Sequence, residues 1–292
     1  MRLDTKAEVV AFMSSSGHCT FDCQYCIINP IAKKKPSLDY EDIRFFLERL
    51  GNRKAFLAFS GVGDFFAGYS KSQRLLDRIL DHDVEVALDT NGAITQEFPE
   101  LDASKLAKIR YINLTMHYRQ IKEKGLLKLW ARNAEMFHRR AERVIMQDYI
   151  LSPDLADEWD EAIHYYAHEV FPQTGKTILL IRDVNRPMNS SQEAAIAALS
   201  QTYSEVIGGA HQENFAAPFV GKETVQCPAG QSYFRVWNDG RVQGCPNLPG
   251  VKAFQDNGNL KERRLHISPT PFSCNSPQYC DCQVIEGLGK MG

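Results

Sequence analysis

The 292-residue sequence has no apolar run long enough to cross a membrane, and its first ten residues lack the apolar segment of a secretory signal. It also lacks a strong excess of charge, since its formal net charge is only −2. A near balance of charge, with no basic stripe, argues against a protein that binds nucleic acid through an electrostatic surface. We therefore expect a soluble cytoplasmic protein that binds neither nucleic acid nor membrane.

Cysteine is missing from the 200 positions between Cys26 and Cys227, although the chain contains eight cysteines. Three of them fall within residues 19–26 and five within residues 227–282. Structural disulfides are uncommon in the cytoplasm, and cysteines grouped at short spacing are typical of metal or cluster ligands. The sequence therefore predicts one such site near each end of the chain.

The cysteine-free middle of the chain alternates between strand-like and helical patterns. Helical periodicity covers residues 119–140, 154–170 and 190–206, and two shorter amphipathic segments precede them, the first behind a cap at Ser37 or Asp39. The strand-like runs are continuous rather than alternating, as in parallel strands buried on both faces. They are Glu8–Met13, Lys54–Phe59, Val84–Asp89, Tyr111–Met116, Val144–Ile150 and Thr177–Ile181.

Six strand–helix units predict an α/β fold, either a βα barrel or an open doubly wound sheet. Because six units are fewer than the eight of a closed barrel, we expect a partial (β/α)6 barrel over residues 1–208. After Gly208-Gly209 the sequence becomes rich in Gly, Pro, Asn and Cys, and Asn238-Asp239-Gly240 predicts the turn of a β-hairpin. Residues 209–292 are thus predicted to form a small cysteine-rich α+β module that needs its metal to fold.

The first cysteine group reads Cys19, Cys23 and Cys26, directly after the first predicted strand. Three thiolates on one short loop can hold three irons of a [4Fe–4S] cubane and leave the fourth iron open, whereas the usual electron-transfer cluster has four protein thiolates. An open iron can chelate the amino and carboxylate groups of S-adenosylmethionine. The alternative is a zinc site with His18 as fourth ligand, although adjacent His18 and Cys19 make an awkward tetrahedron.

This loop, with Tyr25 before its third cysteine, resembles the signature of the radical S-adenosylmethionine (SAM) superfamily. The segment Gly61–Asp64 resembles the family's glycine-rich motif that holds the methionyl amino group, with Asp64-Phe65 in place of Glu-Pro, and Thr90-Asn91-Gly92 resembles its Thr-Asn-Gly turn. An ordinary βα turn or a structural role in the barrel mouth is the alternative for each. His117 is a further candidate, for a SAM contact or for acid–base action on the substrate. The resemblance implies cofactor contacts at Gly61, Val62, Gly63, Asp64, Asn91, Thr115 and Gln147.

The spacing Cys227-x12-Gly240-x4-Cys245 resembles the opening of the SPASM and twitch modules of radical SAM enzymes, which bind auxiliary [4Fe–4S] clusters. Five cysteines suffice for one four-thiolate cluster with one left over, so the resemblance implies a twitch-like module. A structural zinc ribbon is the alternative. The close pair Cys280 and Cys282 could both be ligands, or one could donate a hydrogen atom to a substrate radical. The five candidate ligands are Cys227, Cys245, Cys274, Cys280 and Cys282.

The resemblance implies an enzyme that, with a reductant such as flavodoxin or ferredoxin, cleaves SAM to a 5′-deoxyadenosyl radical and abstracts hydrogen from a C–H bond. The first predicted strand lies close to Met1, so we expect no leader-peptide-binding domain before it. We therefore favour a small polyhydroxylated, sugar-like substrate, with oxidation or epimerisation as the outcome. A peptide-modifying maturase is the alternative. A non-catalytic iron–sulfur scaffold or electron-transfer protein would not need the loop Gly61–Gly63.

Overall fold

The computed structural model describes residues 7–14, 18–23, 25–26, 37–60, 63–67, 69–94, 98, 100–141, 145–183, 186–211, 225–244 and 256–274. Several predicted site residues lie outside this part of the chain, namely Gly61, Val62, Cys245, Cys280 and Cys282, and the side chain of Cys274 does too. In the described residues, no helix has the length and apolar character that a membrane span requires.

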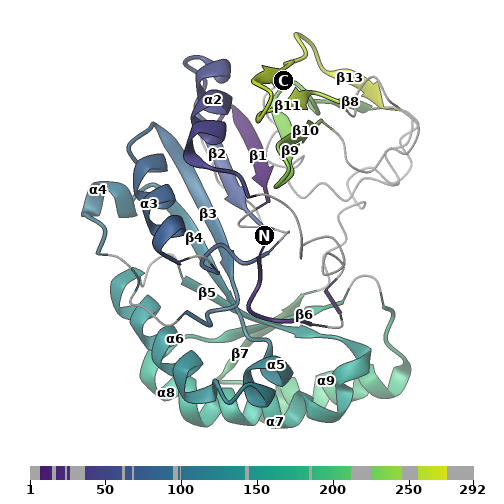
Figure 1. Ribbon diagram of the computed structural model, residues 1–292. Helices are drawn as coiled ribbons and strands as arrows, with labels where there is room; N and C mark the ends of the chain where they lie inside the picture. Colours follow the sequence, from purple (N-terminus) through teal and green to yellow (C-terminus); the bar gives the residue numbers. More distant parts are fainter. Residues whose placement is uncertain are drawn as a thin grey trace.

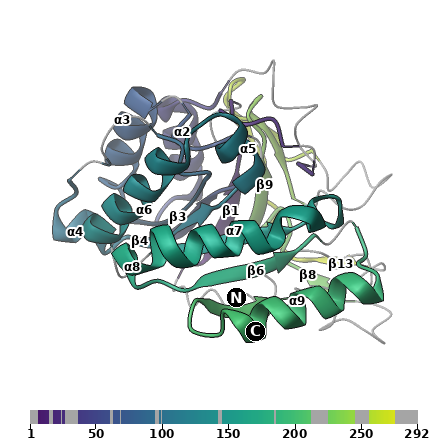
Figure 2. The ribbon, with the colours of Figure 1, turned by 90° about the horizontal axis from the view of Figure 1, so that it is seen from below.

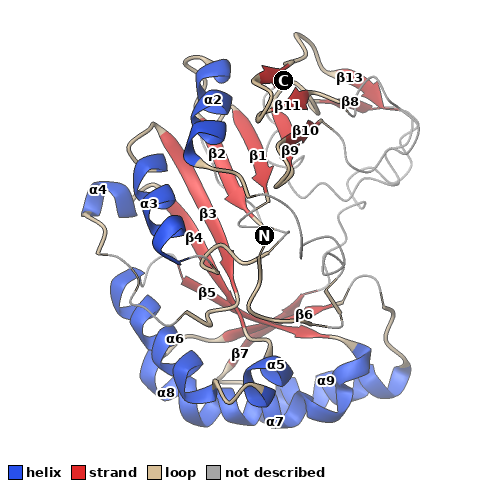
Figure 3. Cartoon of the chain, viewed as in Figure 1, coloured by secondary structure: helices blue, strands red, loops and turns tan. Residues whose placement is uncertain are grey.

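A large parallel sheet forms the centre of a mixed α/β fold (Figures 1 and 3). The first six strands in the described chain coincide with the six predicted runs, and a seventh, β7, follows them. Strand β7 crosses residue 208, where we predicted the domain boundary. Their order is sequential, from β1 (Val9–Met13) and β2 (Ala55–Phe59) through β3 (Val84–Thr90), β4 (Ile109–Thr115), β5 (Ile145–Leu151) and β6 (Ile178–Arg182) to β7 (Ile207–His211).

The helices run along the outer side of the curved sheet (Figures 1 and 2). Helix α2 begins behind Asp39, whose carboxylate accepts a hydrogen bond from the Asp42 amide in a capping box. The segment predicted as one helix over 119–140 is two helices, because Gly125 has a φ of +66° between them. The helices are α2 (Tyr40–Leu50), α3 (Tyr69–Ile79), α4 (Ala103–Leu106), α5 (Tyr118–Glu123), α6 (Leu127–Ala141), the 3-10 helix η2 (Pro153–Glu158), α7 (Trp159–Tyr165), the π-helix η3 (Tyr166–Val170), α8 (Phe171–Thr174) and α9 (Ser190–Thr202).

Side chains alternate between the two faces of the sheet, and this alternation separates the core from the site. The outward side chains of the central strands, such as Leu88 and Leu114, belong to one apolar core with Trp130 and Phe137 of helix α6. The alternate positions of the same strands point to the inner face, and several of them are polar. The candidate site residues described below come from this inner face and from the loops at the carboxyl ends of the strands.

The predicted C-terminal hairpin extends the main sheet beyond β1. Strand β9 (Tyr233–Val236) pairs in parallel with β1, and β10 (Arg241–Gln243), β11 (Gly258–Asn259) and β12 (Arg264–Leu265) follow in antiparallel order. The hairpin turn requires a glycine at Gly240, since its φ is +88° and a β-carbon there would lie 2.5 Å from the Asn259 Oδ1 atom. Strands β8 (Val225–Cys227) and β13 (Phe272–Cys274) form a separate pair.

Candidate functional site

The three N-terminal cysteines line one cavity of about 320 Å³ at the carboxyl ends of the parallel strands. Cys23 is buried, whereas Cys19 and Cys26 are exposed. Burial is the main reason that the pKa of the Cys23 thiol rises to about 12 in the chain without metal. A bound metal centre would have to supply the positive charge that makes this sulfur a thiolate.

Asn91 connects the turn after β3 to the cysteine loop. Its Nδ2 atom lies 3.5 Å from the Cys19 Sγ atom and donates to the Thr20 hydroxyl at 3.0 Å. The backbone amide of Phe21 lies 3.4 Å from the same Cys19 sulfur. The Cys19 sulfur therefore already has two N–H donors, as expected for a ligand of an iron–sulfur cluster.

Asp64 joins the loops that follow the first three strands. Its buried carboxylate accepts hydrogen bonds from the Asn91 amide at 2.6 Å and the Phe66 amide at 2.8 Å. Its own backbone amide donates to the His18 carbonyl at 2.6 Å. Burial raises the pKa of Asp64, and these hydrogen bonds oppose that shift. Both carboxylate oxygens of Asp64 thus accept hydrogen bonds from backbone amides. The preceding residue, Gly63, has a φ of +84° and lines the cavity.

The turn Thr90-Asn91-Gly92 rests on helix α6. The indole Nε1 of Trp130 donates to the Asn91 carbonyl at 2.8 Å, and Asn133 Nδ2 donates to the Gly92 carbonyl at 2.7 Å. Gly92 has a φ of +69°, and a β-carbon on it would lie 2.8 Å from the indole nitrogen. The apolar core thereby fixes the position from which Asn91 reaches the cysteine loop.

Polar side chains from β3, β4 and β5 line the same cavity. They are Asp89, Asn113, Thr115 and Asp148, of which only Thr115 was predicted. Asn113 Nδ2 donates to the Asp148 carboxylate at 2.8 Å. Burial, with a contribution from the charge of Asp148, raises the pKa of Asp89 to about 6. For Asp89 and Asp148 the sequence signal was a charged residue inside an otherwise apolar strand run, because a buried charge is costly unless it is paired or hydrogen-bonded.

Gln147 is a predicted cofactor contact that points away from the cavity. Its Oε1 atom accepts a hydrogen bond from the Tyr166 hydroxyl in the helical layer, and Gln147 is buried there. The next residue, Asp148, points to the opposite face and lines the cavity instead. Successive strand residues alternate between faces, so a difference of one position decides which side chain can reach a ligand.

His117 lies in the cavity wall and contacts the cysteine loop. Its Nδ1 atom is 2.6 Å from the Tyr25 hydroxyl oxygen, and the two rings stack with centroids 5.7 Å apart. Its ring also meets the edge of Phe21 at 5.9 Å. Burial lowers the pKa of His117 to about 4, so its imidazole is neutral at pH 7.

Two of the C-terminal cysteines lie on paired strands. In the β8–β13 ladder Cys227 is opposite Phe272, and Cys274 is opposite Val225. Within the residues that the structure describes, no three His, Cys, Asp or Glu side chains are arranged to hold a single metal ion. This finding does not apply to a cubane cluster, because each thiolate that holds a cubane binds a different iron, so the thiolates need not converge on one ion.

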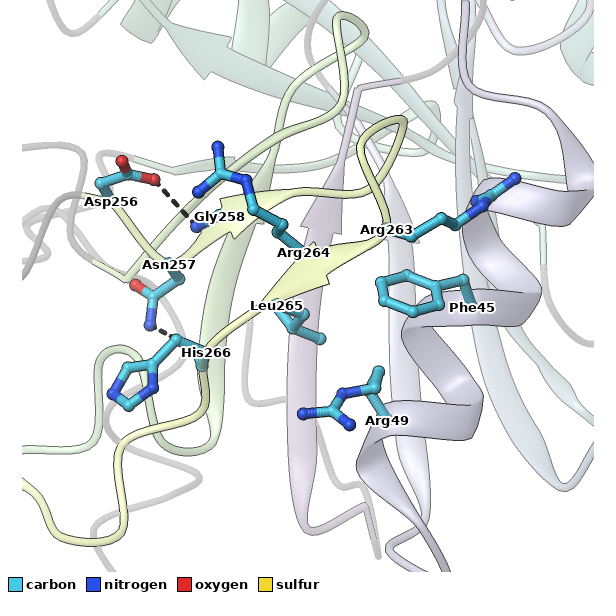
Figure 4. Close-up of a pocket in the computed structure, with 9 residues that line it drawn as sticks. All are labelled: Phe45, Arg49, Asp256, Asn257, Gly258, Arg263, Arg264, Leu265 and His266. Carbon is cyan, nitrogen blue, oxygen red and sulfur yellow. Dashed lines mark hydrogen bonds between the residues drawn. The ribbon is translucent and has the colours of Figure 1, made fainter.

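A second cavity, of about 440 Å³, lies between α2 and strands β11 and β12 (Figure 4). Three of its nine lining residues are arginines, and two of these are already paired. Arg263 binds Asp42 at 3.1 Å and Arg264 binds Glu262 at 2.6 Å. None of the predicted site residues lines this cavity, so the cavity with the cysteines is the candidate functional site.

No protein-family model and no curated protein matches the sequence. Among solved structures, anSMEcpe with bound AdoMet and Cp18Cys peptide matches with a TM-score of 0.52 at 13% identity, covering 96% of this chain and 82% of that chain. Streptococcus suis SuiB bound to precursor peptide SuiA matches with a TM-score of 0.51 at 10% identity, covering 97% of this chain. This chain spans 66% of the length of the SuiB chain. Both are radical SAM enzymes, and the likeness shows that this chain shares with them a mixed α/β fold built on a large parallel sheet.

Proposed function

We propose that this protein is a radical SAM enzyme whose [4Fe–4S] cluster is held by Cys19, Cys23 and Cys26. The observation that carries the proposal is the convergence of these cysteines, Gly63 and Asn91 on one cavity in a fold shared with two radical SAM enzymes. The three cysteines lie within eight consecutive residues, so their thiolates can bind three of the four irons of one cubane. Gly63 has no side chain at its positive φ, so its backbone can approach a bound methionyl group closely.

When bound, the cluster supplies the electron that cleaves SAM to methionine and a 5′-deoxyadenosyl radical, which abstracts hydrogen from substrate. The chain's own task is to align the two reactants and to exclude water. Asp64 and Asn91 hold the loops around the cofactor, and Thr115 offers a hydroxyl from the wall. Gln147 supports the sheet from its outer side, and Asp148 is the side chain next to it on β5 that faces the cavity.

We propose a small polyhydroxylated substrate, with oxidation or epimerisation of one carbon. Asp89, Asn113 and Asp148 support this, because they bring two carboxylates and an amide oxygen into a cavity of about 320 Å³. Carboxylates are hydrogen-bond acceptors when ionised, so they suit the hydroxyl donors of a sugar-like molecule.

A peptide substrate is the second candidate. Its support is that the solved anSMEcpe and SuiB structures contain the Cp18Cys peptide and the precursor peptide SuiA. Products distinguish the candidates, because a peptide substrate would change mass or stereochemistry at one residue. A non-catalytic electron-transfer protein is the third candidate, and it would form no 5′-deoxyadenosine.

We further propose that the main sheet is a partial barrel, with one strand more than the sequence predicted, and that a twitch-like module follows it. The position of β7 in the main sheet supports a boundary after His211 rather than at 208. Paired strands that carry Cys227 and Cys274 support a shared auxiliary [4Fe–4S] cluster. Four of the five C-terminal cysteines would bind it, as in the expectation from the sequence.

Anaerobic reconstitution of the full chain tests this function. We expect close to eight irons per chain, and replacement of Cys19, Cys23 and Cys26 by Ala should remove about half of them and abolish 5′-deoxyadenosine formation. Cys227→Ala is the matched variant, since it should lower iron content through the other group of cysteines. A protein that holds zinc without iron at the C-terminal site would refute the auxiliary cluster, and reconstituted protein that never cleaves SAM would refute the enzyme.

A further inference from the structure

Tyr25 occupies the space between the buried cysteine and the end of strand β4. Its hydroxyl oxygen is 2.6 Å from His117 Nδ1, and the same hydroxyl is hydrogen-bonded to the thiol of Cys23. The stacked rings of Tyr25 and His117, together with Phe21 against the imidazole, fix the direction of this hydroxyl. Residues 92 positions apart in sequence thus form a continuous path to one cluster ligand.

The proton count of this path depends on the state of Cys23. The neutral His117 has one ring proton and the Tyr25 hydroxyl has one, so each can donate one hydrogen bond. A cluster-bound thiolate has no proton and is a strong acceptor. With Cys23 in that state, the arrangement that satisfies every group has His117 Nδ1–H donating to the tyrosine oxygen and Tyr25 donating to the sulfur.

We propose that Tyr25 and His117 form a relay that donates a hydrogen bond to the Cys23 sulfur and raises the reduction potential of the SAM-binding cluster. The inference rests on the proposed function, because it requires the cluster. A hydrogen bond to a ligating sulfur stabilises the more negative, reduced cluster, and such bonds are among the features that set cluster potentials. His117 is therefore a positioning residue, since it acts on the cluster through Tyr25.

An EPR-monitored redox titration of the reconstituted full chain tests the relay. Tyr25→Phe keeps the ring and removes the donor, and we expect the ratio of reduced to oxidised cluster at a fixed potential to fall about tenfold, a downward shift of about 59 mV. His117→Phe should shift the potential in the same direction by a smaller amount. His117→Gln should restore part of the shift, because the glutamine amide can donate to the tyrosine oxygen.

A second tyrosine–histidine pair in the chain provides the matched control. The Tyr40 hydroxyl is 2.8 Å from His82 Nε2 with ring centroids 5.9 Å apart, and neither residue lines the cysteine cavity. Tyr40→Phe and His82→Phe should leave the cluster potential unchanged. The double variant of Tyr25 and His117 should equal Tyr25→Phe alone, because the histidine acts through the tyrosine.

Three results would overturn the relay. One is a Tyr25→Phe protein with full iron and the wild-type potential. Another is an effect of His117→Phe that persists when Tyr25 is already phenylalanine. The third is loss of iron from both Tyr25→Phe and His117→Phe while the control variants keep theirs, which would make the pair a scaffold for the loop. Failure of the wild-type chain to assemble any cluster would instead count against the proposed function.

Discussion

Gly92→Ala is the substitution for which the structure allows the sharpest prediction. Gly92 has a φ of +69°, and a β-carbon on it would lie 2.8 Å from Trp130 Nε1 and 2.9 Å from Leu114 Cδ2. Two costs follow. The left-handed backbone costs a residue with a β-carbon about 1–2 kcal/mol. Displacement of the indole breaks its buried hydrogen bond to the Asn91 carbonyl, and the unpaired groups cost about 1–3 kcal/mol more.

Gly125→Ala separates the two costs. Gly125 has nearly the same φ, +66°, but a β-carbon on it would meet nothing within 4 Å. We expect Gly125→Ala to lower the free energy of unfolding by about 1–2 kcal/mol through backbone strain alone. Gly92→Ala should lower it by about 2–5 kcal/mol, the sum of strain and the displaced indole.

Urea denaturation of the two variants without metal measures the difference between these effects. We also expect Gly92→Ala to weaken SAM binding to the reconstituted protein, because Asn91 would no longer reach Cys19 from its present position. Gly125→Ala should leave that affinity unchanged. Equal destabilisation by the two substitutions would refute the reasoning, since it would mean that the Trp130 indole can be displaced without any loss in the free energy of unfolding.

Three further predictions concern other parts of the chain. Burial raises the pKa of Asp89 to about 6, above its unfolded value, so ionisation of this carboxyl destabilises the folded state. As the pH rises from 4 to 7, the wild type should therefore lose up to about 3 kcal/mol of stability relative to Asp89→Asn, measured by urea unfolding. A difference between the two proteins that stays constant across this pH range would contradict the prediction. Asp42 is 2% exposed and binds two cationic side chains of the β11–β12 turn, so Asp42→Ala should cost about 2 kcal/mol in the same assay, and no loss would show that these ion pairs contribute little. Cys280→Ala and Cys282→Ala should each lower the iron content of the auxiliary site; a variant that keeps its iron but loses solvent-deuterium incorporation into product would indicate a hydrogen-atom donor and an epimerase.

The six predicted strands could be found from sequence because each run is mostly apolar and rich in β-branched and aromatic residues. Strand β7 could not, since Ile207–His211 contains two glycines, and glycine weakens strand propensity. The structure explains one of them. A β-carbon at Gly208 would lie 2.6 Å from the Thr177 Oγ1 atom, so close approach to the chain that leads into β6 requires a glycine there. Of the two glycines at the predicted domain boundary, Gly208 is therefore required by tight packing.

The candidate site was predictable where local spacing carries the chemistry and not where distant segments meet. Cys19, Cys23 and Cys26 are recognisable from eight consecutive residues. The choice between Gln147 and Asp148 depends on the register of β5 in the sheet, which sequence similarity to a motif does not resolve. The contact of His117 with Tyr25 depends on the whole path of the chain between them.

The departure from Glu-Pro at Asp64-Phe65 also has a physical account in these contacts. The Asp64 carboxylate accepts from the amides of Asn91 and Phe66, and its backbone amide donates to the His18 carbonyl, so this one residue joins the loops after β1, β2 and β3. Asn91 then extends this connection to Cys19. Such a network fixes the positions of Asn91 and Cys19 relative to Asp64, and groups that are already held lose less conformational entropy when a ligand binds. The geometry of the proposed cofactor site therefore depends on how well these three loops are held, as much as on the cysteines themselves.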